Sequence, residues 1–139
     1  MNKALSILIS VLVATVVVIG LAIVGSPSEQ RMLSLDKTRV KDLRKISSNI
    51  EGRWDRIEEL PSELQVLVDG IHMQSLPLDP ETDQPYEYQA RGSASFDLCG
   101  TFALPSEPAK DSSFWDHPEG RHCFEFELDP DQSSDEDSN

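Results

Sequence analysis

Basic residues are scarce in this chain: 12 Lys and Arg stand against 25 Asp and Glu, and the formal net charge is −13. The acidic excess lies after residue 58, where three basic residues accompany nineteen acidic ones. Nucleic acids and anionic lipid surfaces attract clustered Lys and Arg, and they repel a region this acidic. Nucleic acid is therefore disfavoured as a partner.

The short motifs that indicate common catalytic sites are also missing. The sequence contains no P-loop, no dinucleotide-binding fingerprint and no G-x-S-x-G. Acid–base catalysis by two carboxylates could use any pair among 25, so no particular pair is indicated. We expect a protein that is not an enzyme and carries no cofactor.

Cysteine is limited to Cys99 and Cys123, with 23 residues between them. In an oxidising compartment a disulfide between them would stabilise a small domain by about 3 kcal/mol. Buried free thiols are one alternative. A metal site joining the cysteines to His117 and His122 is another, although the CxxC or paired-ligand spacing typical of zinc sites is absent.

Only one long apolar run is present, residues 4–25, and it contains no charged residue. A helix of that length spans roughly 33 Å, enough to cross a hydrocarbon core of about 30 Å. A cleaved secretory signal is the rival interpretation, but its apolar core would span only about 7 to 15 residues. We therefore predict a retained transmembrane anchor, residues 1–25, that contacts the lipid bilayer through residues 4–25.

The charges around the anchor leave its orientation open. Lys3 precedes the apolar run, whereas six basic residues follow it within residues 31–45. Taken literally, the positive-inside rule places the following domain in the cytoplasm as a tether. Long domains, however, cross the membrane largely regardless of their charge.

The segment after the anchor has the pattern of a long amphipathic helix, residues 26–58. Ser26, Pro27 and Glu29 form a helix start with a capping box, and Leu60-Pro61 ends the helix. One apolar stripe recurs at steps of three and four residues: Val40, Leu43, Ile46, Ile50, Trp54 and Ile57. We expect the stripe to pack on the protein's own sheet, with coiled-coil dimerisation as the alternative.

Residues 59–85 are predicted to form a short helix followed by a turn-rich stretch. Residues 62–65 have the pattern of a second capping box, and Gly70 that of a helix stop. The turn contains the alternating acids Asp79, Glu81 and Asp83, which could supply oxygens to Ca²⁺. The glycine and terminal glutamate of an EF-hand loop are absent, so ordinary turn chemistry is favoured.

The remaining sequence predicts an antiparallel sheet. Alternating or apolar residues favour strands at 86–90, 96–104 and 121–128, the first two joined by a turn. With the short helix they make up residues 59–128, which we expect to form one α+β domain with the amphipathic helix. The tail, residues 129–139, has five acids and no apolar side chain, and it is predicted to be disordered.

Several motifs give the chain a resemblance to pilins and type II secretion pseudopilins: Leu60-Pro61-Ser62-Glu63-Leu64, and Asp79-Pro80 followed by Pro85-Tyr86-Glu87-Tyr88. It also resembles uncharacterised bacterial single-pass membrane proteins with a pilin-like domain, through Leu98-Cys99 and His122-Cys123-Phe124. The resemblance implies a bacterial inner-membrane anchor with a periplasmic domain, and no catalysis. The Gly-Phe processing junction and the glutamate of filament subunits are absent from residues 1–24.

We therefore expect a non-catalytic protein-interaction module that binds an envelope protein, in a context related to secretion or pili. Two contact surfaces are expected: the exposed part of the helix over residues 40–57, and the loop around Phe114 and Trp115. The alternative is an envelope metal-binding protein or enzyme that uses His117, His122 and the cysteines.

Overall fold

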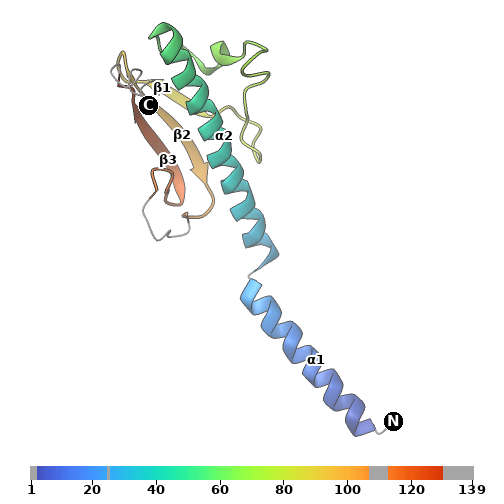
Figure 1. Cartoon of the computed structure of the whole chain (residues 1–139). Coiled ribbons are helices and arrows are strands. Elements are labelled where there is room, and N and C mark those ends of the chain that lie inside the picture. Colours follow the sequence, from blue (N-terminus) through green and yellow to red (C-terminus); the bar gives the residue numbers. More distant parts are fainter. Residues whose placement is uncertain (1–2, 25, 107–112, 130–139) are drawn as a thin grey trace, which may run out of the picture. The chain divides into compact units, whose positions relative to one another are not determined.

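The computed structural model describes residues 3–24, 26–106 and 113–129 (Figure 1). The chain divides into two compact units, residues 1–34 and 35–139. The described residues form α-helices, one short 3₁₀ helix and an antiparallel sheet. The predicted α+β class is confirmed.

Helix α1 spans Lys3–Val24 and corresponds to the predicted anchor. Its side chains from residue 3 to residue 21 are exposed. The segment Lys3–Leu21 is long and apolar enough to cross a membrane.

Helix α2 spans Pro27–Ile57 and begins where the sequence predicts. The backbone N–H of Glu29 donates to Ser26 Oγ at 3.3 Å, which is the expected capping hydrogen bond. The helix ends before Leu60-Pro61, because Glu58 adopts a left-handed backbone conformation with φ of 51°.

The second predicted helix is only a single 3₁₀ turn, η1, at Leu64–Leu67. The predicted capping box is wrong, because the N-cap residue is Glu63 and its side chain makes no capping hydrogen bond. Gly70 is not the helix stop either. The chain turns at Asp69 instead, whose carboxylate accepts the backbone N–H of Ile71 at 2.9 Å.

The strands are β1 (Glu87–Ala90), β2 (Ser95–Phe102) and β3 (Gly120–Glu127), in the order β1-β2-β3. Both pairings are antiparallel, and Cys99 lies directly opposite Cys123. The predicted hairpin and third strand are confirmed, with shifts of one or two residues at most of the strand ends. The predicted tail lies outside the described residues beyond Asp129, as do residues 107–112 of the loop before β3.

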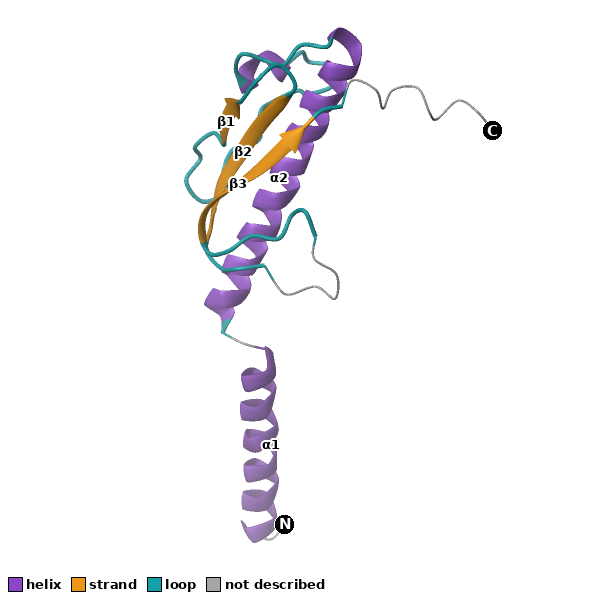
Figure 2. Cartoon of the chain, turned by 90° about the vertical axis from the view of Figure 1, so that its left-hand side faces the viewer, coloured by secondary structure: helices purple, strands orange, loops and turns teal. Residues whose placement is uncertain are grey.

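Helix α2 lies along one face of the sheet (Figure 2). Its apolar stripe packs on that face, as expected. Its central residues Leu43, Ile46 and Ile50 are fully buried. They share one core cluster with side chains of the two longer strands: Phe96, Leu98, Phe102 and Phe124. The exception in the stripe is Ile57, which is 50% exposed.

Candidate interaction site

Phe114 and Trp115 lie in a short turn whose own polar groups hold it in shape. Asp116 N–H donates to the carbonyl of Ser113 at 2.9 Å, and Ser113 N–H donates to Asp116 Oδ2 at 2.8 Å. Trp115 N–H donates to Ser113 Oγ at 3.3 Å. The turn therefore presents the two aromatic side chains in a defined arrangement.

The two aromatic residues have different environments. Trp115 is half-buried, and its ring lies 4.8 Å from that of Phe124 and 5.8 Å from that of Phe126, centroid to centroid. The Arg44 guanidinium of α2 also lies over this ring, 5.2 Å from its centroid, which is within cation–π range. Trp115 thus anchors the loop to the domain.

Phe114 is the outward-facing member of the pair, with 54% of its surface exposed. Its ring packs edge-on against Trp115 at 5.3 Å and against Phe126 at 5.0 Å, so it rests on other aromatic rings. The expectation of an exposed aromatic residue is confirmed for Phe114. A role of either residue in binding a partner stays a prediction.

A groove of about 440 Å³ adjoins these rings, between α2 and β3. Nine residues line it: Arg44, Ser47, Ser48, Glu51, Phe114, Trp115, Glu125, Phe126 and Glu127. Three of these residues are aromatic and three are glutamates. Burial raises the pKa of the Glu51 carboxyl, and the neighbouring charge of Asp55 raises it further.

The other predicted contact surface, on the helix over residues 40–57, presents little apolar area. Most of the apolar side chains of this stretch lie against the sheet. Ile57, at the end of the helix, is the large apolar side chain of residues 40–57 that is mainly exposed. The groove beside Phe114 is therefore the stronger candidate for binding.

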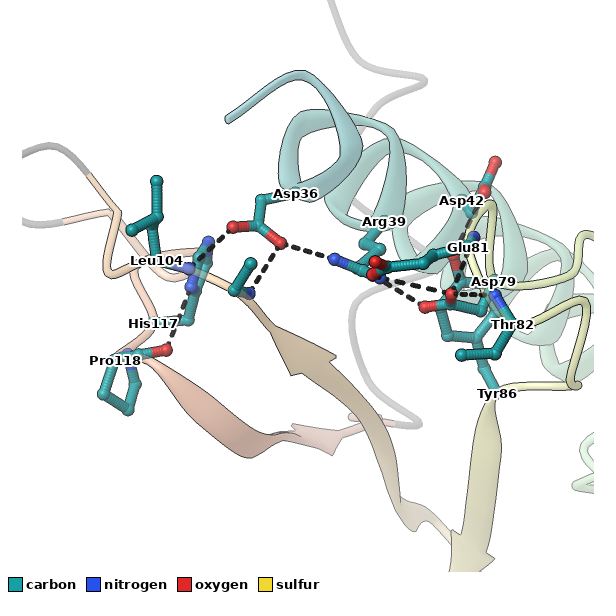
Figure 3. Close-up of polar contacts among 11 residues, drawn as sticks. Asp36, Arg39, Asp42, Asp79, Glu81, Thr82, Tyr86, Leu104, His117 and Pro118 are labelled. Atoms are coloured by element: carbon teal, nitrogen blue, oxygen red, sulfur yellow. Dashed lines mark hydrogen bonds and ion pairs between the residues drawn. The ribbon is translucent and has the colours of Figure 1, made fainter. Parts of the chain in front are cut away.

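A second polar site is built around Arg39, whose side chain is only 4% exposed (Figure 3). Its guanidinium donates to Asp36 at 2.8 Å, to Asp79 at 2.6 Å and to Glu81 at 2.7 Å. Asp36 also accepts the backbone N–H groups of Ala103 at 3.0 Å and Leu104 at 2.9 Å. These contacts join α2 to the turn before β1 and to the chain after β2.

The predicted turn chemistry at residues 79–83 is confirmed by these contacts. Asp79 Oδ1 accepts the backbone N–H of Glu81 and of Thr82, both at 3.0 Å. Although burial raises the pKa of Asp79, the hydrogen bond from Arg39 and these two N–H groups bring it down to about 2. Arg39 therefore pairs with Asp79 and Glu81, two of the three acids of this turn.

The predicted disulfide between Cys99 and Cys123 is present. It joins the two longer strands of the sheet at directly opposed positions. Because both sulfurs are in this bond, neither cysteine offers a thiolate to a metal ion.

The two histidines of the metal hypothesis lie in separate aromatic contacts. His117 is buried, and its ring stacks on Phe102 at 3.6 Å. His122 packs edge-on against Phe124 at 4.8 Å. Within residues 3–24, 26–106 and 113–129, no three His, Cys, Asp or Glu side chains come together in a way that could hold a metal ion.

Sequence reasoning missed two parts of these sites. Nothing in the sequence pattern connects Glu51, Glu125 and Glu127 with the aromatic loop, because these residues lie far from it along the chain or on another element. Sequence reasoning also missed that Arg39 would be buried among carboxylates. The spacing of Asp36 and Arg39, which fits an i, i+3 pair on the helix, was the available signal for that site.

No family model, no curated protein and no solved structure matches this chain.

Proposed function

We propose that this protein is a single-pass protein of the bacterial inner membrane whose α+β domain lies outside the cytoplasm and binds another envelope protein without catalysis. The apolar helix α1 supports membrane attachment. The disulfide supports an oxidising compartment, because such bonds persist in the periplasm and are rare in the cytosol.

The observation that carries the binding role is the exposed Phe114 side chain beside the groove. An aromatic side chain that is held by a structured turn costs little conformational entropy when a partner covers it. Aromatic residues, phenylalanine included, are also enriched at the centres of protein interfaces. Phe114 meets both conditions.

The order of elements supports the proposal of a pilin-like domain. An apolar N-terminal helix, a long amphipathic helix and a small antiparallel sheet follow one another along the chain. Since residues 1–24 contain no glutamate, we propose a secretion- or pilus-related accessory role in place of filament assembly.

The experiment replaces Phe114 by Ser in cells that produce the full chain with a photo-reactive amino acid at Ser48 in the groove. We expect the yield of cross-linked partner to fall at least tenfold. The matched control is Ile71→Ser, which removes an apolar side chain that is 82% exposed and does not line the groove. An undiminished yield in Phe114→Ser would contradict the proposal.

A further inference from the structure

Strand β3 forms one edge of the sheet, since the strand order is β1-β2-β3. It has eight residues, whereas the opposite edge strand β1 has four. An edge strand carries a row of backbone N–H and C=O groups that can pair with another chain. The longer row of such backbone groups is on β3.

The register shows which backbone groups of β3 point outward. Leu128 N–H donates to the carbonyl of Ala94 at 2.7 Å, just beyond the Ser95–Glu127 pair. Hydrogen-bonded and non-hydrogen-bonded pairs alternate along an antiparallel ladder. Glu127, Glu125 and Cys123 therefore occupy non-hydrogen-bonded positions.

The Cα atoms of Cys99 and Cys123 are 4.0 Å apart, which agrees with the narrow spacing of a non-hydrogen-bonded pair. At such positions the backbone N–H and C=O point away from the neighbouring strand. The backbone groups of Cys123, Glu125 and Glu127 thus face the edge of the sheet, where no further strand lies among the described residues.

The groove beside Phe114 reaches this edge. It is lined by three consecutive residues of β3, Glu125, Phe126 and Glu127. Consecutive side chains of a strand point to opposite faces of the sheet, so a hollow that touches all three includes the strand edge. The far wall of the groove belongs to α2, through Arg44 and Glu51.

The side chains around the edge define what could pair there. On the α2 face, an added strand would meet the rings of Phe114, Trp115 and Phe126. On the other face it would lie beside the exposed carboxylates of Glu125 and Glu127. The cation of the groove, Arg44, already lies over the Trp115 ring.

We propose that the β3 edge binds an extended segment of a partner protein as a fourth strand, with apolar side chains in the groove and Lys or Arg beside Glu125 and Glu127. Strand addition supplies affinity through the main chain and specificity through alternate side chains. The inference rests on the proposed function, because it names the partner chemistry of the same groove. A second copy of the chain fits less well, since it brings the same glutamates and a net charge of −13.

The probe is a fluorescent peptide of alternating Lys and Val, with blocked ends, titrated against the full-length protein in zwitterionic detergent micelles. A second peptide of the same sequence carries N-methyl groups on the residues that would pair with β3. N-methylation removes the hydrogen-bond donors and leaves the charge unchanged. We expect saturable binding of the first peptide and at least tenfold weaker binding of the second.

Variants of the protein test whether the backbone N–H groups of β3 take part in the pairing. Glu125→Pro removes an outward N–H, a change that edge strands tolerate. Glu125→Gln removes the same charge and keeps the N–H. We expect Glu125→Pro to bind the peptide at least fivefold more weakly than Glu125→Gln, with circular dichroism confirming the fold of both.

Equal binding of the two peptides, or no saturable binding, would overturn the inference and leave only charge attraction. Equal affinity of the folded variants Glu125→Pro and Glu125→Gln for the peptide would overturn it too. If Glu125→Pro fails to fold, the comparison of the two peptides decides alone. A Phe114→Ser effect on partner cross-linking without a difference between peptides would retain the proposed function and reject strand addition. A difference between the peptides without an effect of Phe114→Ser on partner cross-linking would reject the proposed function.

Discussion

Single side chains decide how the loops are held against α2. Arg39 is buried with the carboxylates of Asp36 and Asp79. Arg121 and Glu87, in contrast, form a pair in which both side chains are more than half exposed. Exposed ion pairs contribute about 0 to 1 kcal/mol, but removing one partner of a buried pair leaves an uncompensated charge and costs about 3 to 5 kcal/mol. The two sites should therefore respond very differently to mutation.

Arg39→Met is expected to lower the free energy of unfolding by about 3 kcal/mol, because Asp36 and Asp79 lose their buried cation. The control Arg121→Ala, at the exposed pair, should have a much smaller effect, because both of its charges stay in contact with water. Urea unfolding followed by tryptophan fluorescence measures both. Similar losses in the two variants would show that the Arg39 site does not hold the loops.

Acidification tests the same site through Asp79. The pKa of Asp79 is about 2 in the folded protein, because hydrogen bonds from Arg39 and backbone N–H groups outweigh the effect of burial, whereas an unfolded Asp titrates near 3.9. With the folded value the lower one, its contribution is fully present above about pH 5 and is lost as the pH falls toward 2.

We therefore expect the wild-type protein to lose about 2 kcal/mol more unfolding free energy between about pH 5 and pH 2 than the variant Asp79→Asn does. Urea titrations at stepped pH measure the difference. If the two stability curves ran parallel through this range, the carboxylate of Asp79 would not be stabilised by its partners.

The elements of the domain are joined mainly through β2. It pairs with both other strands, and its buried side chains meet the apolar stripe of α2 in one core. The disulfide adds a covalent link between β2 and β3, closing a loop with a sequence separation of 24. A loop of that size adds about 3 kcal/mol of stability by restricting the unfolded chain.

Replacing both Cys99 and Cys123 by Ala should lower the free energy of unfolding by about 3 kcal/mol while leaving the strand register intact. A reducing agent should destabilise the wild-type protein by a similar amount. The double variant supplies the control, because its thermal midpoint should not respond to the reductant. A midpoint that is insensitive to reductant in the wild type would argue against a stabilising role of this bond.

For the molecule as a whole, the combination of an apolar helix and an acidic α+β domain is the basis of the proposed location. Helix α1 carries few charges that could fix its direction in a membrane, since Lys3 is its one charged residue among those that the structure describes. The disulfide is therefore the better guide to the compartment of the domain.

Topology can be measured in cells with single cysteines in the background in which Cys99 and Cys123 are Ala. We expect a membrane-impermeant maleimide to label Ser93→Cys, an exposed site next to β2, once the outer membrane is made permeable. Asn2→Cys, on the other side of the apolar run, should react only after the inner membrane is disrupted. The opposite labelling pattern would place the domain in the cytoplasm as a tether.

The elements of this protein could be predicted from local pattern. The charge-free run of α1, the three- and four-residue steps of Leu43, Ile46 and Ile50, and the alternation of β1 are each visible in a short window. The capping box at Ser62 was wrong because the same residue types also begin turns, and Asp69 directs the chain into one.

The sequence by itself determined the two long helices and the three strands, because periodicity and capping depend on near neighbours. Only the tertiary structure decided that Arg39 is buried against Asp79, forty residues away, and that Glu125 lies on an edge strand beside Phe114. Such pairings depend on strand order and on which helix face covers the sheet. These properties arise from the packing of the whole domain and leave little trace in any short stretch of residues.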